Sequence, residues 1–386
     1  MRTYEEINSR IESGDAVVMT AEEVKAFAAE HGVEKVEREV DVVTTGTFGA
    51  MCSSGAFVNF GHSEPPIKMA KVWLNDVPSY AGLAAVDAYI GATELSESAP
   101  CGYGGAHVIE DLVGGKAVHL RASAAGTDCY PRKDIDTYIS LRTVNQAYLY
   151  NPRNAYQNYA VATNSSDRVL YTYMGKLLPH NGNATFSSAG QLSPLLNDPQ
   201  LLTIGMGTKI FLGGGIGYVS WEGTQYKTNV PVRNGLPVGA ARTLAVMGDL
   251  RGMSPEYVRG LYFTGYGCSL GLGIGIPIPI LNGEIAKAVS VTEDQIFAQV
   301  LDYSVQSRAR KPIREVSYQE LRSGTIDIGG KEVRTSSLSS YRKALKIAKE
   351  LKEWIEKGQF DLVRPAGEFP AERSQKALEV LSCEEA

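Results

Sequence analysis

The loop around Cys129 is the stretch of this sequence with the clearest chemical potential. Residues 126–133 read Gly-Thr-Asp-Cys-Tyr-Pro-Arg-Lys, and the glycine and proline predict a turn between regular elements. A cysteine reacts as the thiolate. Arg132 and Lys133 favour that charged form, whereas Asp128 opposes it. A buried structural cysteine is the alternative, and this loop alone leaves both interpretations open.

Cys52 is the second candidate nucleophile. It follows a predicted buried strand at residues 41–45 and lies in the string GTFGAMCSSG, whose small residues leave backbone amides accessible. Positions between a strand and a loop often bind anions or carry nucleophiles. Cys129 also follows a predicted strand, at residues 116–122. Our hypothesis is that the two cysteines face one cleft at the same sheet edge.

Cys268 is expected in a glycine-rich loop that follows a predicted helix at residues 255–263, for which Ser254 is the N-cap and Pro255 the first helical residue. Three converging thiolates from Cys52, Cys129 and Cys268 could hold a [4Fe–4S] cluster and leave its fourth iron open to sulfide. These three positions form no compact ligand run, so the cluster is kept as an alternative.

Other catalytic patterns offer less. Walker, HExxH and CxxC motifs are absent. The glycines at 213–217 do not form a dinucleotide-binding loop and instead indicate close backbone approach. Each histidine is more simply read as a core or surface residue than as a ligand; the five are His31, His62, His107, His119 and His180.

Composition limits the function further. The net charge is −5 and charged residues make up 21% of 386, so neither nucleic acid nor a membrane surface is an expected partner. The polar N-terminus has no signal segment, no apolar run is long enough to span a membrane, and five scattered cysteines make no disulfide framework. We therefore expect a cytoplasmic protein with reduced thiols.

The predicted fold is α/β, with a mixed α+β arrangement as the alternative. Thr20 and Glu23 predict a capped helix ending before Gly32, and residues 340–358 predict the clearest helix. We expect a single large glycine-rich globular domain over residues 1–360, followed by a docked C-terminal tail at 361–386 that includes Cys383.

Residues 135–162 are rich in tyrosine and asparagine. Such a run suits a polar pocket wall and suits a packed subunit interface equally well. Whether the protein forms a homo-oligomer therefore stays open at this point.

Several strings resemble a known family: GAHVIEDLVGGK, GTDCYPRK, FLGGGIGYVSWEGTQ, GIGIPIPILN and SLSSYRKALKIAKELKEWIEKGQF. They are similar to the homocysteine-biosynthesis family, the L-aspartate semialdehyde sulfurtransferases, over almost the whole chain. Many archaeal members continue into a pair of CBS domains. This sequence resembles a form without them, for which nucleotide regulation through those domains is not expected.

The resemblance implies an enzyme that makes homocysteine from L-aspartate semialdehyde, sulfide and two electrons. It implies catalytic roles for Cys129 and Cys52, with Cys129 as the persulfide carrier. No flavin or nicotinamide motif is present, so the electrons are expected from a partner that carries NIL and ferredoxin-type domains. Arg132 and Lys133 are the expected substrate-binding residues: Arg132 suits a carboxylate and Lys133 an oxyanion. A cluster-dependent sulfurtransferase and a non-catalytic sulfur carrier or scaffold are the alternatives.

Overall fold

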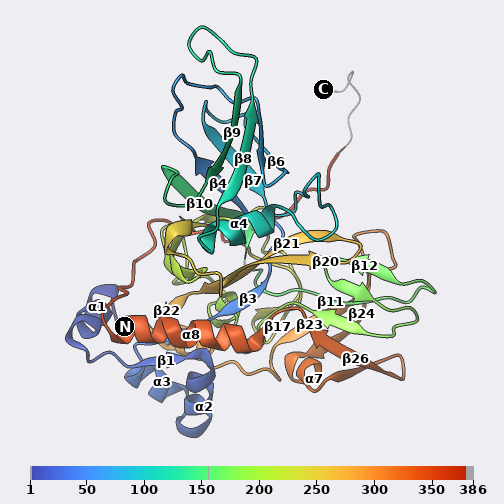
Figure 1. Cartoon of the computed structure of the whole chain (residues 1–386). Coiled ribbons are helices and arrows are strands. Elements are labelled where there is room, and N and C mark those ends of the chain that lie inside the picture. The colour runs from blue at the N-terminus through green and yellow to red at the C-terminus, as the bar shows by residue number, and fades with distance from the viewer. Residues whose placement is uncertain (1, 155, 380–386) are drawn as a thin grey trace.

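Capped helices begin the chain, as predicted. A computed structural model describes residues 2–154 and 156–379. Thr20 and Glu23 form a complete capping box at the start of the second helix, and Gly32 ends it. The three N-terminal helices are α1 (Tyr4–Ser13), α2 (Ala21–His31) and α3 (Val33–Glu39). They lie together with α8 at one end of the molecule (Figure 1).

A nine-stranded antiparallel sheet forms the centre. Its order is β20-β21-β15-β16-β19-β10-β4-β7, and β3 pairs with β21 beside this path. The strands are β3 (Thr47–Ala50), β4 (Gly55–Asn59), β7 (Asp87–Gly91), β10 (Gln146–Asn154), β15 (Lys209–Leu212), β16 (Gly215–Glu222), β19 (Leu244–Asp249), β20 (Val258–Phe263) and β21 (Gly267–Gly275). The predicted close approach at residues 213–217 is confirmed, because a Cβ at Gly215 would lie 2.5 Å from the Gly252 carbonyl oxygen. Gly213 and Gly214 form the turn between β15 and β16 with positive φ.

A six-stranded mixed sheet lies beside the central one. Its order is β24-β23-β11-β14-β26-β25, and the pairs β11–β23 and β14–β26 are parallel. The strands are β11 (Val161–Thr163), β14 (Ala184–Phe186), β23 (Phe297–Asp302), β24 (Pro312–Ser317), β25 (Thr325–Ile328) and β26 (Lys331–Ser337). Parallel neighbours end at the same sheet edge, and in this protein that edge faces a pocket.

A four-stranded sheet, in the order β6-β5-β8-β9, rises from the rest of the molecule at the top of Figure 1. Its strands are β5 (Lys71–Leu74), β6 (Val77–Ser79), β8 (Val118–Ser123) and β9 (Asp134–Ile139). Three smaller sheets complete the strands: β1 (Val18–Thr20) with β2 (Val42–Thr44) and β22 (Pro277–Pro279), β12 (Leu170–Thr172) with β13 (Gly175–Leu177), and β17 (Val232–Arg233) with β18 (Leu236–Pro237).

The remaining helices pack onto these sheets. They are α4 (Gly105–Val113), α5 (Pro194–Asn197), α6 (Gly283–Val289), α7 (Tyr318–Arg322) and α8 (Tyr341–Glu356), with short 3₁₀ turns η1 (Gly190–Leu192) and η2 (Leu250–Gly252). The helix α8 confirms the clearest sequence prediction. It buries one apolar face, and its backbone meets the chain so closely that a Cβ at Gly46 would lie 2.1 Å from the Ala344 carbonyl oxygen.

The mixed α/β fold and the single globular domain are confirmed. One large cluster of buried apolar residues joins helices α2 and α3 to residues of the nine-stranded and four-stranded sheets. A second cluster is formed mainly by residues of the six-stranded sheet. Almost all pairing is antiparallel, so the arrangement is the mixed alternative rather than a parallel α/β sheet. No described helix is long and apolar enough to cross a membrane.

The prediction of a helix at residues 255–263 is wrong. Ser254 does act as a cap, since its hydroxyl accepts from the Glu256 amide at 3.2 Å, but only one turn forms before β20 begins. Pairing with β21 along the whole of β20 provides backbone hydrogen bonds that a helix would lose. The α4 helix also packs on β20, where a Cβ at Gly260 would lie 2.5 Å from the His107 ring.

The C-terminal segment docks on the surface as far as Gln375, whose side-chain amide donates to the Tyr226 carbonyl at 2.7 Å. Gly367 forms a β-bridge with Met206, and the Arg373 amide donates to the Thr228 hydroxyl at 3.0 Å. Cys383 lies outside the described residues.

Candidate active site

Cys52 lies in a tight turn between β3 and β4. The Ser54 amide donates to the Met51 carbonyl at 3.1 Å and closes the turn, while the Met51 amide donates to Leu270 on β21 at 2.7 Å. The predicted position of Cys52 just beyond a strand is confirmed. Because both flanking strands belong to the central sheet, the thiol is held on a rigid support.

A buried asparagine anchors this turn to β10. The Asn151 side-chain amide donates to the Ser54 hydroxyl at 2.8 Å, and its oxygen accepts from the Arg153 backbone amide at 2.8 Å. The register between β10 and β19 shifts after Asn151, and β10 therefore bulges where it passes the turn. One side chain thus fixes both the Cys52 turn and the backbone that carries Arg153.

Two hydroxyl groups face the Cys52 sulfur. The Ser269 hydroxyl donates to it at 3.3 Å, and the Tyr266 hydroxyl lies close enough for the Cys52 thiol to influence its pKa. Burial, and after it the Cys52 thiol, raise the pKa of Tyr266 to about 12, so this hydroxyl keeps its proton at neutral pH. Donors aimed at sulfur stabilise a negative charge there.

Ser269 itself is not a nucleophile of the hydrolase type. Residues 267–271 read Gly-Cys-Ser-Leu-Gly, which fits the G-x-S-x-G pattern. That pattern requires a sharp turn from a strand into a helix, whereas Ser269 is fully buried within β21. Its hydroxyl is committed to Cys52.

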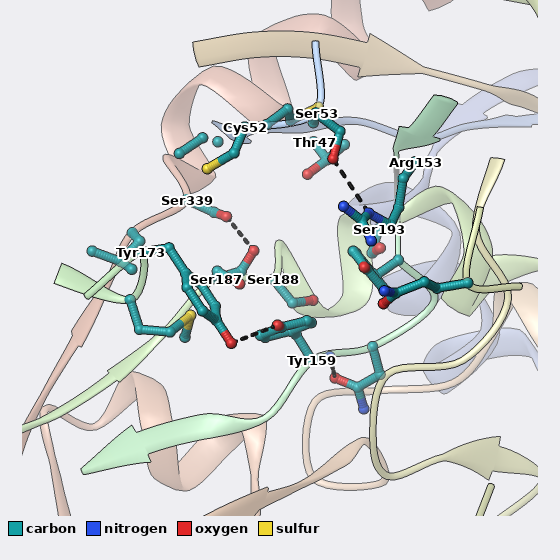
Figure 2. Close-up of a pocket in the computed structure, with 18 of the residues that line it drawn as sticks. Thr47, Cys52, Ser53, Arg153, Tyr159, Tyr173, Ser187, Ser188, Ser193 and Ser339 are labelled. Atoms are coloured by element: carbon teal, nitrogen blue, oxygen red, sulfur yellow. Dashed lines mark hydrogen bonds between the residues drawn. The ribbon is translucent and has the colours of Figure 1, made fainter. Parts of the chain in front are cut away.

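The Cys52 turn opens onto a pocket of about 300 Å³, shown in Figure 2. One wall comes from β3 and the turn of the central sheet, and the opposite wall from loops of the six-stranded sheet. Half of the lining residues carry a hydroxyl group: Thr47, Ser53, Tyr156, Tyr159, Tyr173, Ser187, Ser188, Ser193, Tyr266 and Ser339. This size is at the lower end for small-molecule sites and suits a small polar metabolite.

Parallel strands deliver the serines. Ser187 and Ser188 follow β14, and Ser339 follows β26, which is its parallel neighbour. The Ser339 hydroxyl donates to the Ser187 carbonyl, as Figure 2 shows. The segments after β14 and β26 therefore leave the sheet at the same edge, which faces Cys52.

Tyrosines form a connected floor. The Tyr159 hydroxyl donates to that of Tyr173 at 3.1 Å, and Tyr173 and Tyr303 share a hydrogen bond of 3.2 Å. Burial raises the pKa of Tyr159 and Tyr303 far above the usual range. These phenols are protonated donors at neutral pH. The pocket-wall interpretation of residues 135–162 is confirmed for Tyr156 and Tyr159, which line the pocket.

Arg153 and Arg308 bring positive charge to the pocket. The Arg153 guanidinium donates through Nε to the Ser53 hydroxyl at 3.3 Å. The sequence prediction missed both arginines as well as Tyr266 and Ser269. Arg153 lies within the tyrosine- and asparagine-rich run, which was the available signal, whereas Arg308 lies in a basic stretch that resembles any solvated loop.

Cys129 does not lie in this pocket. It is exposed in the loop between β8 and β9, so its predicted loop position is confirmed. The β3 strand before Cys52 belongs to the nine-stranded sheet and β8 to the four-stranded sheet. The hypothesis of a common sheet edge is therefore wrong, because the two strands, although similar in local sequence, join different sheets.

Arg132 and Lys133 also lie away from the Cys52 pocket. The Arg132 guanidinium donates to the Glu64 carbonyl at 2.9 Å, and the Arg132 backbone amide donates to the Pro66 carbonyl at 3.2 Å. The Lys133 side chain is near Gly126, where a Cβ would approach it to 3.2 Å. In this conformation the Arg132 side chain holds the loop in place, and the predicted substrate contacts of Arg132 and Lys133 stay a prediction.

Cys268 is separated from Cys52 by a strand. It lies inside β21, not in the predicted loop, and its sulfur is 3.8 Å from His107 Nδ1 on α4. Successive side chains of a strand point to opposite faces, and the next residue, Ser269, reaches Cys52. Burial raises the pKa of Cys268, which disfavours the thiolate that a metal would need.

The three predicted cluster ligands are thus not gathered in the described structure. Among residues 2–154 and 156–379, no group of three or more Cys, His, Asp or Glu side chains is placed to hold a metal ion. Cys52 and Cys268 face opposite sides of β21, and Cys129 is on another sheet. The [4Fe–4S] alternative has no assembled ligand set here and is left to experiment.

Comparison with known proteins agrees with the family resemblance. Residues 16–362 match the family described as "Homocysteine biosynthesis enzyme, sulfur-incorporation". A Methanosarcina acetivorans protein named L-aspartate semialdehyde sulfurtransferase is 54% identical, over 98% of this chain and 74% of that protein. One of the same name from Methanocaldococcus jannaschii is 51% identical, over 93% and 72%.

More distant matches add less. An uncharacterized protein of Methanothermobacter thermautotrophicus is 30% identical, over 84% of this chain and 73% of that protein. No solved structure matches. The extent of the family match and the identity to the two named relatives lead to one conclusion: this chain belongs to the family of sulfur-incorporating homocysteine biosynthesis enzymes.

Proposed function

We propose that this chain incorporates sulfur into L-aspartate semialdehyde to form homocysteine, and that Cys52 is the thiol that delivers sulfur to the substrate. The observation that carries the proposal is the Cys52 pocket, which holds a thiol that accepts a hydrogen bond from Ser269 and has space for a small molecule. Two relatives at 51–54% identity bear the name of this activity.

The chemistry fits the side chains around the sulfur. A persulfide on Cys52 attacks the aldehyde carbon, and the carbonyl oxygen becomes an oxyanion that requires a proton. The protonated phenol of Tyr266 is suited to donate to it. Loss of water and reduction then produce the thiol. Counted from sulfide, aldehyde plus H₂S plus two electrons and two protons gives the thiol and one water.

Carriage of the sulfur as a persulfide requires two further electrons. A persulfide does not form from sulfide without a two-electron oxidant, so its outer sulfur comes from a donor persulfide or polysulfide, which gives up that sulfur and leaves as a thiolate or a shortened polysulfide. Four electrons are then consumed in all: two cleave the sulfur–sulfur bond to Cys52, and two reduce the carbon. We assign these electrons to an external ferredoxin-type partner.

Cys129 is proposed to load sulfur from outside. An exposed thiol on a loop is accessible to a large donor. The Cys52 thiolate attacks the terminal sulfur of a Cys129 persulfide and releases the Cys129 thiolate, a transfer that consumes no electrons. The described arrangement places Cys129 outside the pocket, so this step requires movement of residues 124–133 or the same loop of a second copy.

The test compares wild type with Cys52→Ala, Cys129→Ala and Cys268→Ser after anaerobic purification. Iron, acid-labile sulfide, sulfane sulfur and turnover with L-aspartate semialdehyde, a sulfane-sulfur donor such as polysulfide, and a low-potential reductant are measured. We expect sulfane sulfur without iron, homocysteine formation lost in both alanine variants, and both properties kept in Cys268→Ser. About four irons per chain, lost with Cys129, would establish the cluster mechanism instead. No turnover by wild type with a reduced partner would indicate a sulfur carrier.

A further inference from the structure

The Cys52 pocket carries positive charge without an acidic counterpart. Its charged lining residues are Arg153 and Arg308, and no Asp or Glu is found among the described residues that line it. A pocket of this kind favours a negatively charged ligand. It offers no carboxylate to pair with an ammonium group.

Arg153 is placed to receive that negative charge beside the reacting sulfur. Its Nε donates to the hydroxyl of Ser53, the residue directly after Cys52, and Figure 2 shows the guanidinium next to Ser53 at the pocket. The guanidinium has five N–H donors in a planar fork, and the other donors suit both oxygens of a carboxylate. The Asn151 contact with the Arg153 amide fixes the backbone below.

Arg308 acts on the same region from another loop. Burial raises the pKa of Tyr156, and the charges of Arg153 and Arg308 both oppose that rise, while Cys52 adds to it. Tyr156 therefore lies within the electrostatic influence of both guanidinium groups and of the thiol. Arg308 is exposed on its loop, so we expect a smaller contribution from it than from Arg153.

The proposed substrate is short. Standard bond lengths put the carboxylate carbon of a four-carbon aldehyde about 4 Å from its aldehyde carbon. A carboxylate held near Ser53 thus leaves the aldehyde carbon within reach of sulfur on the preceding residue.

We propose that Arg153, supported by Arg308, binds the carboxylate of the aldehyde substrate, and that the pocket selects the substrate by this carboxylate and not by its ammonium group. The inference rests on the proposed function for the identity of the aldehyde. It assigns to Arg153 the carboxylate contact that the sequence suggested for Arg132, whose guanidinium is bound to the Glu64 carbonyl.

Kinetics on the full chain with its reductant provide the first test. Arg153→Gln should raise KM for L-aspartate semialdehyde about 30-fold, equivalent to about 2 kcal/mol, with kcat changed far less. Arg153→Lys keeps the charge but loses the planar fork of donors, so its KM should lie between those of wild type and Arg153→Gln. Arg142→Gln, an exposed arginine outside the pocket, makes the same charge change and should leave KM unaltered. An unchanged KM in Arg153→Gln would overturn the proposal.

Protection of Cys52 from iodoacetamide is the second test and needs no turnover. L-Homoserine, 4-hydroxybutanoate, which lacks the amine, and L-homoserine amide, which lacks the carboxylate, are compared by peptide mass spectrometry. The two acids should protect within about 5-fold of each other, and the amide at least about 30-fold less well. Equal protection by the amide would refute carboxylate selection, and strong protection by L-homoserine alone would refute indifference to the ammonium.

The two tests separate the inference from the function. If wild type makes no homocysteine but the acids protect Cys52 through Arg153, the proposed function fails and the carboxylate site stands. If homocysteine is made and Arg153→Gln behaves as wild type in both tests, the function stands and the inference fails. The comparison of acid with amide on wild type holds even where a variant does not fold.

Discussion

Removal of the Asn151–Ser54 hydrogen bond should destabilise the Cys52 turn in a strongly non-additive way. Asn151 is 0% exposed and Ser54 2%. Leaving one buried partner without the other costs about 1–3 kcal/mol. Asn151→Ala also removes the acceptor for the Arg153 amide, so we expect a loss of about 3 kcal/mol, against about 2 kcal/mol for Ser54→Ala.

The double variant reveals the coupling. Once Asn151 is alanine, Ser54→Ala leaves no further donor unpaired, so Asn151→Ala/Ser54→Ala should cost about 3 kcal/mol, not the sum of about 5 kcal/mol. Urea unfolding under anaerobic, reducing conditions measures these free energies. The rate of Cys52 alkylation, followed in parallel, should rise in each variant because the turn is less constrained.

Additivity would refute this reasoning. If the single costs add to within about 0.5 kcal/mol, the two side chains do not share the bond, and the account of the turn is wrong. Ser63→Ala is a suitable control partner, because the Ser63 hydroxyl is exposed and donates to the Pro65 carbonyl. Asn151→Ala/Ser63→Ala should be additive.

Two further predictions concern stability. Burial, opposed by the charge of Glu293, lowers the pKa of Lys25 from 10.5 to about 7. Between these two pH values the unfolded chain binds one more proton than the folded chain, so the free energy of unfolding should rise with pH, by at most about 1.4 kcal/mol per pH unit. Urea unfolding of wild type and Lys25→Met at pH 7.5 and 9 measures this rise, and an identical pH response in the two proteins would contradict the prediction. Gly46→Ala should cost about 2–3 kcal/mol, because the added Cβ would lie 2.1 Å from the Ala344 carbonyl oxygen, whereas Gly91→Ala, with open space around it, should cost far less in the same assay.

Local signals in the sequence predicted the elements whose stability is local. The Thr20–Glu23 capping box and the amphipathic face of α8 are defined by residues three or four apart, and the structure confirms both helices. The helix prediction for residues 255–263 failed because a cap specifies only the first turn. The conformation of the residues after that turn depends on β21, a partner that local sequence does not reveal.

The candidate site divides in the same way. The sequence by itself identified Cys52 and Cys129 as chemically distinctive and placed each beyond a strand, because turn residues and β-branched runs are read along the chain. Only the tertiary structure decided that the two thiols lie on different sheets, that Cys268 faces away from Cys52, and that Arg153 joins Cys52. Those relations come from strand pairing between segments about 90 or more residues apart, and spacing along the chain carries no record of them.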